Sequence, residues 1–384
     1  MKVKKVLTFF VIFIVLLFHF ELYGARDPIK IGVILSVTGP GSIIGEPGKN
    51  TILLLAEEIN KRGGIKGRPL EVIIEDTKTE ETQAVLAAKK LIERDKVVAI
   101  IGPSTTGESM AVIPIVTQAK IPMVSVAAGS GITEPVSERY WIFKTPQHDR
   151  SAVEAIYRYL KNQRITKVGI LTITTGFGDQ GRRSLLELAP KYGITVVADE
   201  RYKPKDSDMT VQLMKAKNAG AQAIINWSVG PEQIIVTKNW HDLKLGIPLI
   251  QSHGWGSRKN LELAGKAAEG VIAPLGRVVI WEKLPENHPQ KKVIEKYVKS
   301  YTAKYKSEPG NFGGYAYDAF MMVVEAIEKV GPDPVKIRDY LEREIKNWPG
   351  VSGIFNMSPQ DHCGLGPDSF EMTVVKNGVW ETIK

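Results

Sequence analysis

Three hydroxyl-bearing residues, Ser104, Thr105 and Thr106, stand between an apolar run and a stretch with helical periodicity. The first N–H groups of a helix are unpaired and carry partial positive charge, so hydroxyls at this point favour a bound anion, above all a carboxylate. The alternative interpretation is simple N-capping by Thr105 or Thr106, which needs only one hydroxyl. We interpret the loop as a carboxylate site and keep capping as the alternative.

Aromatic side chains follow apolar runs further along the chain. Phe177, Trp227 and Trp255 each come after a run of strand character, and so does His253. A large aromatic side chain lies more often in a core than against a ligand. Because the three stand at corresponding positions, we expect them to cover the apolar body of a ligand, with His253 as a hydrogen-bonding group.

Other chemistries find little support in the sequence. Segment 107–111 (GESMA) resembles a nucleophile elbow around Ser109, but Ala111 stands where glycine belongs and neither His253 nor His288 is fixed as a partner. No histidine pair has metal-binding helical spacing, and the single cysteine, Cys363, excludes a multi-thiolate site. The glycines at 39–41 lack a dinucleotide-binding pattern. We expect no enzyme activity, cofactor or metal; a serine esterase using Ser109 remains the alternative of another class.

Short apolar runs alternate with amphipathic stretches in the first part of the chain. The runs are 29–35, 70–74, 97–101 and 121–126, and the stretches between them are 49–61, 80–94 and 108–118. This alternation predicts an α/β protein with parallel strands. Helices are expected over 290–305, 314–329 and 335–346, followed by an antiparallel hairpin of 370–375 and 379–383 turned at Asn377 and Gly378.

An internal repeat predicts two related lobes. Segment 30–41 (KIGVILSVTGPG) aligns without gaps on 167–178 (KVGILTITTGFG), with five of twelve positions identical. Segments 99–104 and 121–124 match 223–228 and 247–250 in the same order. Each lobe should be a doubly wound sheet with its ligand beyond the carboxyl ends of the strands, which places a cleft between the lobes.

The N-terminus has the pattern of a secretory signal peptide over residues 1–25. Three lysines at positions 2, 4 and 5 precede an apolar run to Phe18, and small residues, Gly24 and Ala25, end the segment. No cysteine lies near Ala25, so no lipid anchor is expected; whether the leader is cleaved or kept stays open. The net charge of +9 is spread along the chain, which argues against nucleic-acid binding.

Several segments resemble the type I periplasmic solute-binding proteins of ABC importers, the leucine/isoleucine/valine-binding family. They are 31–33 (IGV), 38–40 (TGP), 59–70 (INKRGGIKGRPL), Asp76, 90–92 (KLI), 97–102, 121–122 and 313–318 (GGYAYD). The resemblance implies two doubly wound Rossmann-like lobes joined by a three-strand hinge, a monomer, and an ABC permease in the inner membrane as partner. We expect 26–146 plus 275–347 to form the N-terminal lobe and 147–274 plus 348–384 the C-terminal lobe. The hinge crossings are expected near 144–148, 272–276 and 347–352.

The resemblance also implies a set of ligand-binding residues. The ligand carboxylate would be held by Ser104, Thr105 and Thr106 with the loop from Ala127 to Gly129, and an aromatic side chain would fall at Trp227 and another at Phe177. The chain departs from the family at two positions. His253 stands where the family has the acid that holds an ammonium. Gly129 has no hydroxyl, and we expect the hydroxyl of Ser130 to take its place.

A buried ammonium without an anionic partner is unfavourable. The sequence therefore predicts a small carboxylate without an amine, of apolar or aromatic body, as ligand. A true branched-chain amino acid binding protein is the alternative within the family, and a sensor ectodomain of the same fold is the alternative beyond it. The candidate residues are Ser104, Thr105, Thr106, Ala127, Gly129, Ser130, Phe177, Trp227, His253 and Trp255.

Overall fold

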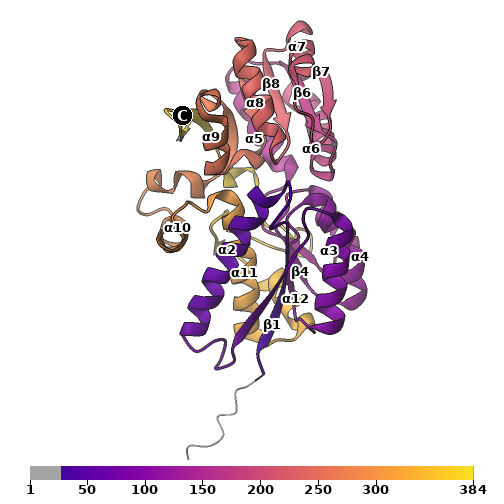
Figure 1. Ribbon diagram of the computed structural model, residues 1–384, viewed down its shortest axis with the longest axis vertical. Coiled ribbons are helices and arrows are strands. Elements are labelled where there is room, and N and C mark those ends of the chain that lie inside the picture. Colours follow the sequence, from indigo (N-terminus) through magenta and orange to yellow (C-terminus); the bar gives the residue numbers. More distant parts are fainter. Residues whose placement is uncertain (1–26, 384) are drawn as a thin grey trace, which may run out of the picture.

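The computed structural model describes residues 27–383 and shows two α/β lobes (Figure 1). The predicted signal peptide, residues 1–25, lies outside the described residues. The first lobe contains a parallel sheet in the order β2-β1-β3-β4-β5. Its strands are β1 (Ile29–Leu35), β2 (Leu70–Asp76), β3 (Ile100–Ile101), β4 (Met123–Ser125) and β5 (Ile142–Lys144).

The second lobe contains a larger sheet in the order β14-β13-β10-β9-β8-β6-β7. Its strands are β6 (Lys167–Ile173), β7 (Thr195–Tyr202), β8 (Ala223–Trp227), β9 (Leu249–Gln251), β10 (Ile272–Gly276), β13 (Phe370–Lys376) and β14 (Val379–Thr382). All pairings are parallel except those of β13 with its two neighbours. The predicted hairpin is confirmed, and Asn377 and Gly378 both adopt the positive φ that its turn requires.

Helices cover the sheets of both lobes. The first lobe has α2 (Ser42–Lys61), α3 (Glu81–Lys89), α4 (Thr106–Ala119), α11 (Gly310–Val330) and α12 (Pro334–Glu344). The second lobe has α5 (Asp149–Asn162), α6 (Gly176–Leu188), α7 (Thr210–Asn218), α8 (Glu232–Leu243) and α9 (Arg258–Ala264), while α10 (Lys291–Tyr305) precedes α11. Figure 1 shows α11 and α12 beside the helices of the N-terminal segment, so the late helices complete the first lobe.

Helix α2 begins at Ser42, earlier than the sequence predicts, because Gly45 lets it approach the end of β1. A Cβ at Gly45 would lie 2.1 Å from the carbonyl oxygen of Ser36. The helix therefore starts directly beside the carboxyl end of the first strand, where only glycine fits.

The C-terminal segment corrects one expected boundary. The sequence places the third crossing near 347–352, but Phe355, Met357 and Cys363 are buried in the core of the first lobe. Strands β11 (Trp348–Pro349) and β12 (Ile354–Phe355) form a small separate hairpin, and the chain joins the second sheet only at Phe370. Burial of these apolar side chains against the first lobe is the reason for the longer path.

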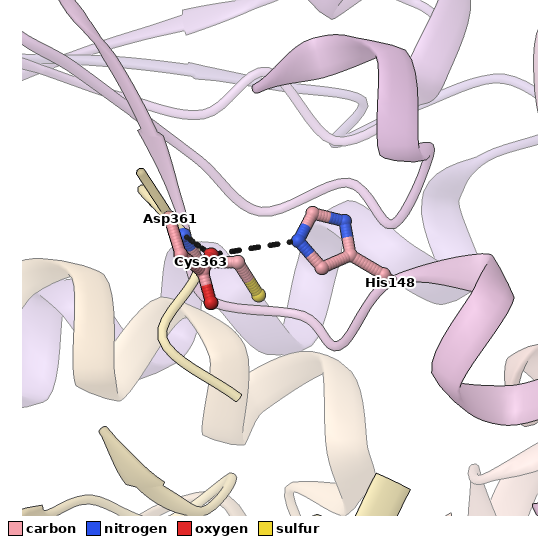
Figure 2. A group of neighbouring side chains, drawn as sticks. All are labelled: His148, Asp361 and Cys363. Atoms are coloured by element: carbon pink, nitrogen blue, oxygen red, sulfur yellow. Dashed lines mark hydrogen bonds and ion pairs between the residues drawn. The ribbon is translucent and has the colours of Figure 1, made fainter. Parts of the chain in front are cut away.

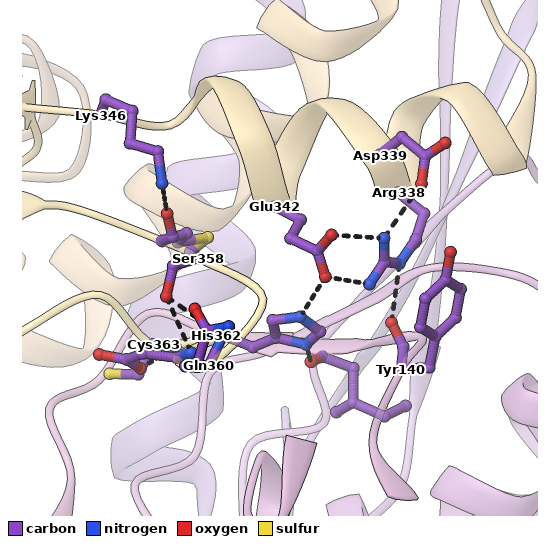
Figure 3. Close-up of polar contacts among 12 residues, drawn as sticks. Tyr140, Arg338, Asp339, Glu342, Lys346, Ser358, Gln360, His362 and Cys363 are labelled. Atoms are coloured by element: carbon purple, nitrogen blue, oxygen red, sulfur yellow. Dashed lines mark hydrogen bonds and ion pairs between the residues drawn. The ribbon is translucent and has the colours of Figure 1, made fainter. Parts of the chain in front are cut away.

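A buried ionic network connects α12 to this segment (Figure 3). Arg338 donates from Nε to the Tyr140 carbonyl at 2.9 Å and from Nη1 to Glu342 Oε1 at 3.0 Å. Glu342 also lies 3.0 Å from His362 Nε2, and His362 Nδ1 lies 2.8 Å from the carbonyl oxygen of Ile142. The network thus joins α12, strand β5 and the C-terminal loop.

Candidate ligand-binding cleft

A cavity of about 350 Å³ lies between the two lobes. From the first lobe it is lined by the segments after β1, β3 and β4, and from the second by those after β6, β8 and β9. These are the carboxyl ends of parallel strands, where doubly wound sheets bind ligands. The repeat-based expectation about which loops face the cleft therefore agrees with the cavity lining.

Helix N-termini from both lobes face this cavity. Thr106 and Gly107 begin α4, and Gly176 and Phe177 begin α6; all four residues line the cavity. The first N–H groups of each helix have no intrahelical partner and carry partial positive charge. The cleft therefore offers backbone donors from both sides.

The Thr105 hydroxyl is used for capping. It donates to Glu108 Oε2 at 2.8 Å and accepts the Glu108 N–H at 3.3 Å, and Glu108 accepts the Thr105 N–H in return. This is a complete capping box. The capping interpretation thus applies to Thr105, and the N–H groups of Thr106 and Gly107 remain at the start of the helix.

Ser104 and Thr106 keep their hydroxyl protons for other partners. Ser104 Oγ accepts the Ser36 N–H at 3.0 Å, and Thr106 Oγ1 accepts the Gly129 N–H at 3.3 Å. Each hydroxyl acts as an acceptor in these bonds, so each can still donate to a carboxylate. Both side chains are buried at the cavity wall.

Glu108 is a buried carboxylate that the sequence analysis missed. It accepts hydrogen bonds from Ser36 Oγ at 2.9 and 3.0 Å and from the Thr77 hydroxyl, besides those from Thr105. The capping-box spacing of Thr105 and Glu108 is the signal that could have found it. Its bonds fix the loop that carries Ser104 and Thr106.

His253 presents two unpartnered nitrogens at the cavity wall. The side chain is 2% exposed, and neither Nδ1 nor Nε2 makes a hydrogen bond within residues 27–383. Its ring packs against Phe177 at 5.4 Å, Trp227 at 5.6 Å and Phe370 at 5.6 Å between centroids. Burial, assisted by the charge of Lys144, lowers the pKa of His253 to about 3. The imidazole is therefore neutral near pH 7 and offers one donor and one acceptor.

The structure brings six of the ten candidate residues to the cavity wall. These are Ser104, Thr105, Thr106, Ala127, Phe177 and His253. Gly129 lies behind Thr106, where a Cβ would come within 2.4 Å of Thr106 Cγ2. Ser130 begins a short 3₁₀ helix, and its buried hydroxyl has no partner among the described residues.

The two tryptophans differ from the expectation that they touch the ligand. Trp227 is 0% exposed and packs behind Phe177 and His253, within the core of the second lobe. Trp255 is equally buried, in a separate core cluster with Leu261 and Leu275. Both side chains are directed into the second lobe. Trp227 therefore supports the cavity wall from behind, and Trp255 packs in the core.

Glu232 is a second acid that the sequence analysis missed. It begins α8, lines the cavity, is 5% exposed and accepts the Lys205 N–H at 2.8 Å. Its position at the first turn of a helix after β8 is the signal that could have found it. Within the described residues the cavity wall contains no lysine or arginine side chain.

Gly178 sets the position of the α6 N-terminus. A Cβ there would lie 1.7 Å from the carbonyl oxygen of Ile173 at the end of β6. Gly178→Ala is therefore expected to push the helix from the strand end and lower the free energy of unfolding by about 2–3 kcal/mol. Chemical denaturation measures the change. Gly366→Ala is the control, since no atom lies within 4 Å of that Cβ position; equal stability of both variants would contradict the prediction.

The sequence matches a family described as periplasmic binding protein over residues 28–377. The chain belongs to this family. It is 27% identical over 320 residues to the leucine-, isoleucine-, valine-, threonine-, and alanine-binding protein of Pseudomonas aeruginosa, covering 83% of each chain. A Leu/Ile/Val-binding protein homolog of Brucella melitensis is 28% identical over 251 residues, 65% of this chain and 67% of the relative.

Solved structures agree with this assignment. An extracellular ligand-binding receptor from Rhodopseudomonas palustris superposes with a TM-score of 0.86 at 27% identity, covering 93% of this chain and 99% of that one. A second solved structure is the branched-chain amino acid transporter substrate binding protein LivJ from Streptococcus pneumoniae, in complex with isoleucine. It superposes with a TM-score of 0.80 at 25% identity, covering 92% of this chain and 98% of that one. The predicted type I periplasmic binding protein fold is confirmed.

The binding protein is a solute receptor and not an enzyme, as its relatives are solute-binding proteins. Ser109, the residue of the esterase alternative, is 0% exposed, and its hydroxyl lies 2.9 Å from that of Ser125. It cannot meet a substrate from this position. The family is extracytoplasmic and works with ABC transporters. In the part of the chain that the structure describes, no helix has the length and apolar character to cross a bilayer.

Proposed function

We propose that this protein delivers a small carboxylate, with an apolar or aromatic body and no amine, to an ABC permease in the inner membrane. The observation that carries the proposal is the neutral, unpartnered imidazole of His253, at the position where the family is expected to hold an ammonium with an acid. The protein acts as a periplasmic monomer after cleavage of its signal peptide near Ala25.

The first lobe supplies the donors for the carboxylate. The N–H groups at the start of α4 and the hydroxyls of Ser104 and Thr106 lie at one wall of the cavity, and Ala127 adds backbone groups. Hydrogen bonds to an ionised acceptor are stronger than neutral ones, so this cluster can hold a carboxylate without a cationic side chain.

The rest of the wall suits an apolar body that carries a single polar group. Phe177, Phe312 and Val229 offer apolar surface, and His253 can pair with a hydroxyl or carbonyl of the ligand. A ligand that filled this pocket without meeting His253 would leave both ring nitrogens unsatisfied, which costs about 1–3 kcal/mol.

A branched-chain amino acid is the second candidate, favoured by Glu232. Among the described residues this buried carboxylate accepts one hydrogen bond, from the Lys205 N–H, and it could pair with an ammonium. The relatives named for leucine, isoleucine and valine binding also favour an amino acid as ligand.

Leucine and 4-methylpentanoate separate the two candidates, because they differ only in the amine. We expect 4-methylpentanoate or benzoate to raise the melting temperature of residues 26–384, whereas leucine does not. A ligand at a thousand times its Kd adds about 4 kcal/mol to the free energy of unfolding. Stabilisation by leucine alone would overturn the proposal in favour of the amino acid.

Thr106→Ala is expected to weaken binding of the carboxylate tenfold or more. The substitution removes a hydroxyl donor at the wall and the acceptor of the Gly129 N–H. Isothermal titration calorimetry measures the loss. Thr117→Ala, in the last turn of the same helix, is the matched control; equal affinities of the two variants would exclude the carboxylate position proposed here.

Glu232→Gln distinguishes the candidates from the opposite side of the cleft. Since the proposed ligand is an anion, removing this negative charge should strengthen its binding by about twofold to fivefold, a change below about 1 kcal/mol. Calorimetry with 4-methylpentanoate measures it, and Glu81→Gln, another acid at the wall but exposed, is the control. A tenfold loss in Glu232→Gln would show that the acid holds a cationic part of the ligand.

A further inference from the structure

His148, Asp361 and Cys363 come together where the segment before α5 meets the C-terminal loop (Figure 2). One potential metal-binding atom from each residue lies within 4.8 Å of the other two. His148 and Cys363 are buried and Asp361 is half-buried. None of the three lines the cavity, so the cluster is distinct from the site described above.

The C-terminal loop holds Asp361 and Cys363 in place. Asp361 Oδ1 accepts the N–H groups of Cys363 at 2.8 Å and Gly364 at 3.0 Å, and Cys363 Sγ donates to the Pro146 carbonyl at 3.3 Å. The backbone thereby directs the carboxylate and the thiol toward the segment that carries His148.

His148 approaches the loop from the other side. Its Nε2 lies 3.7 Å from Asp361 Oδ1 and 4.0 Å from Glu134 Oε1, distances too long for hydrogen bonds. The other ring nitrogen, Nδ1, is buried and has no hydrogen-bond partner within residues 27–383. The residue is 8% exposed, so Nδ1 lacks the hydrogen bond that burial normally demands.

We propose that His148, Asp361 and Cys363 bind a divalent transition-metal ion, with zinc as the best match. Imidazole, carboxylate and thiolate are the three ligand types of tetrahedral zinc. With bonds of about 2.0–2.3 Å, a tetrahedral ion separates its ligand atoms by roughly 3.3–3.8 Å, which agrees with the 3.7 Å between His148 Nε2 and Asp361 Oδ1. Glu134 or a water molecule completes the coordination.

The charges around the cluster favour a cation. Lys144 is buried nearby, its ammonium donating to the carbonyls of Ala128 and Gln147. Asp149 is also fully buried beside it. On metal binding the Cys363 thiol releases its proton to solvent, so the thiolate and the Asp361 carboxylate together offset the two positive charges of the ion.

The site would join the two lobes at their hinge. His148 precedes α5 of the second lobe, whereas Cys363 is packed in the core of the first. A metal ion at this point would fix the crossing segment to the C-terminal loop and stabilise the folded state by mass action.

Cobalt titration of the purified protein tests the proposal directly. Because Cys363 is the only thiol in the chain, a thiolate-to-cobalt charge-transfer band in the near ultraviolet can arise from this site alone. We expect the band to saturate at one equivalent of Co²⁺ and to disappear on addition of Zn²⁺. Absence of the band in the wild-type protein at millimolar Co²⁺ would overturn the proposal, whatever the variants do.

Matched variants locate the other ligands. Cys363→Ser should lose the band, and His148→Gln should weaken zinc binding about a hundredfold. His241→Gln, which removes an exposed histidine beside Asp242, is the control and should change nothing. Near-ultraviolet circular dichroism checks that each variant is folded. Zinc binding that is lost in His241→Gln and kept in His148→Gln would place the ion on the surface and contradict the site.

Discussion

Replacing His253 by glutamate is expected to reduce the affinity for an amine-free carboxylate at least a hundredfold. The substitution places a negative charge where the wall now has a neutral imidazole, beside the aromatic rings of Phe177, Trp227 and Phe370. An anionic ligand would then face a like charge in a poorly hydrated site, where charge interactions are stronger than in water. The same change supplies the anion that a buried ammonium needs.

Calorimetry with leucine and 4-methylpentanoate checks both parts of this prediction. The His253→Glu protein should lose its affinity for 4-methylpentanoate and gain measurable binding of leucine. His253→Gln is the control, since a neutral amide offers a donor and an acceptor like the imidazole and should keep most of the affinity. Unchanged binding of 4-methylpentanoate by a folded His253→Glu protein would show that His253 does not face the ligand.

Arg338→Ala is expected to lower the free energy of unfolding by about 3–5 kcal/mol, because it leaves the buried Glu342 without its guanidinium. The Arg338 side chain is 1% exposed and that of Glu342 is 7% exposed, so water cannot replace the lost partner. The substitution also removes the bond to the Tyr140 carbonyl and the stacking of the guanidinium on the Tyr140 ring, whose centroid is 3.4 Å away. Since the network joins α12 to β5 and the C-terminal loop, the whole first lobe should be destabilised.

Urea denaturation followed by circular dichroism measures this loss. Arg343→Ala, on the exposed side of the same helix, is the matched control and should stay within about 0.5 kcal/mol of the wild type. A double substitution, Arg338→Met with Glu342→Leu, should recover part of the stability because it removes both charges together. A loss below about 1 kcal/mol in Arg338→Ala would show that the network contributes little.

Both lobes present a capped helix N-terminus to the ligand cleft. In each lobe a threonine caps a helix that begins directly after a strand, Thr105 before α4 and Thr175 before α6. The caps satisfy one N–H group and leave the preceding ones directed at the cavity. Hydroxyl-bearing residues line the cavity from both lobes, and the second lobe adds the rings of Phe177 and His253.

Patterns in the sequence predict the α/β fold, the two related lobes and the loops that form the cleft. Alternating strand and helix periods specify parallel sheets, and a parallel sheet brings the carboxyl ends of its strands to one edge. Local chemistry specified the final hairpin, because the turn at Asn377 and Gly378 needs residues that tolerate positive φ. For these reasons the sequence predicts Thr106, Phe177 and His253 at the cavity.

Packing within each lobe selects which side chains at those strand ends point into the cavity and which point into the core. Trp227 and Trp255 follow strands as predicted, yet both are buried in cores, while Glu232 reaches the cavity wall. Residues 355–365 return to the first lobe and bring Cys363 to His148. The sequence pattern did not predict this path either. Strand and helix periods are local, whereas these placements depend on packing between segments far apart in the chain, which no local pattern encodes.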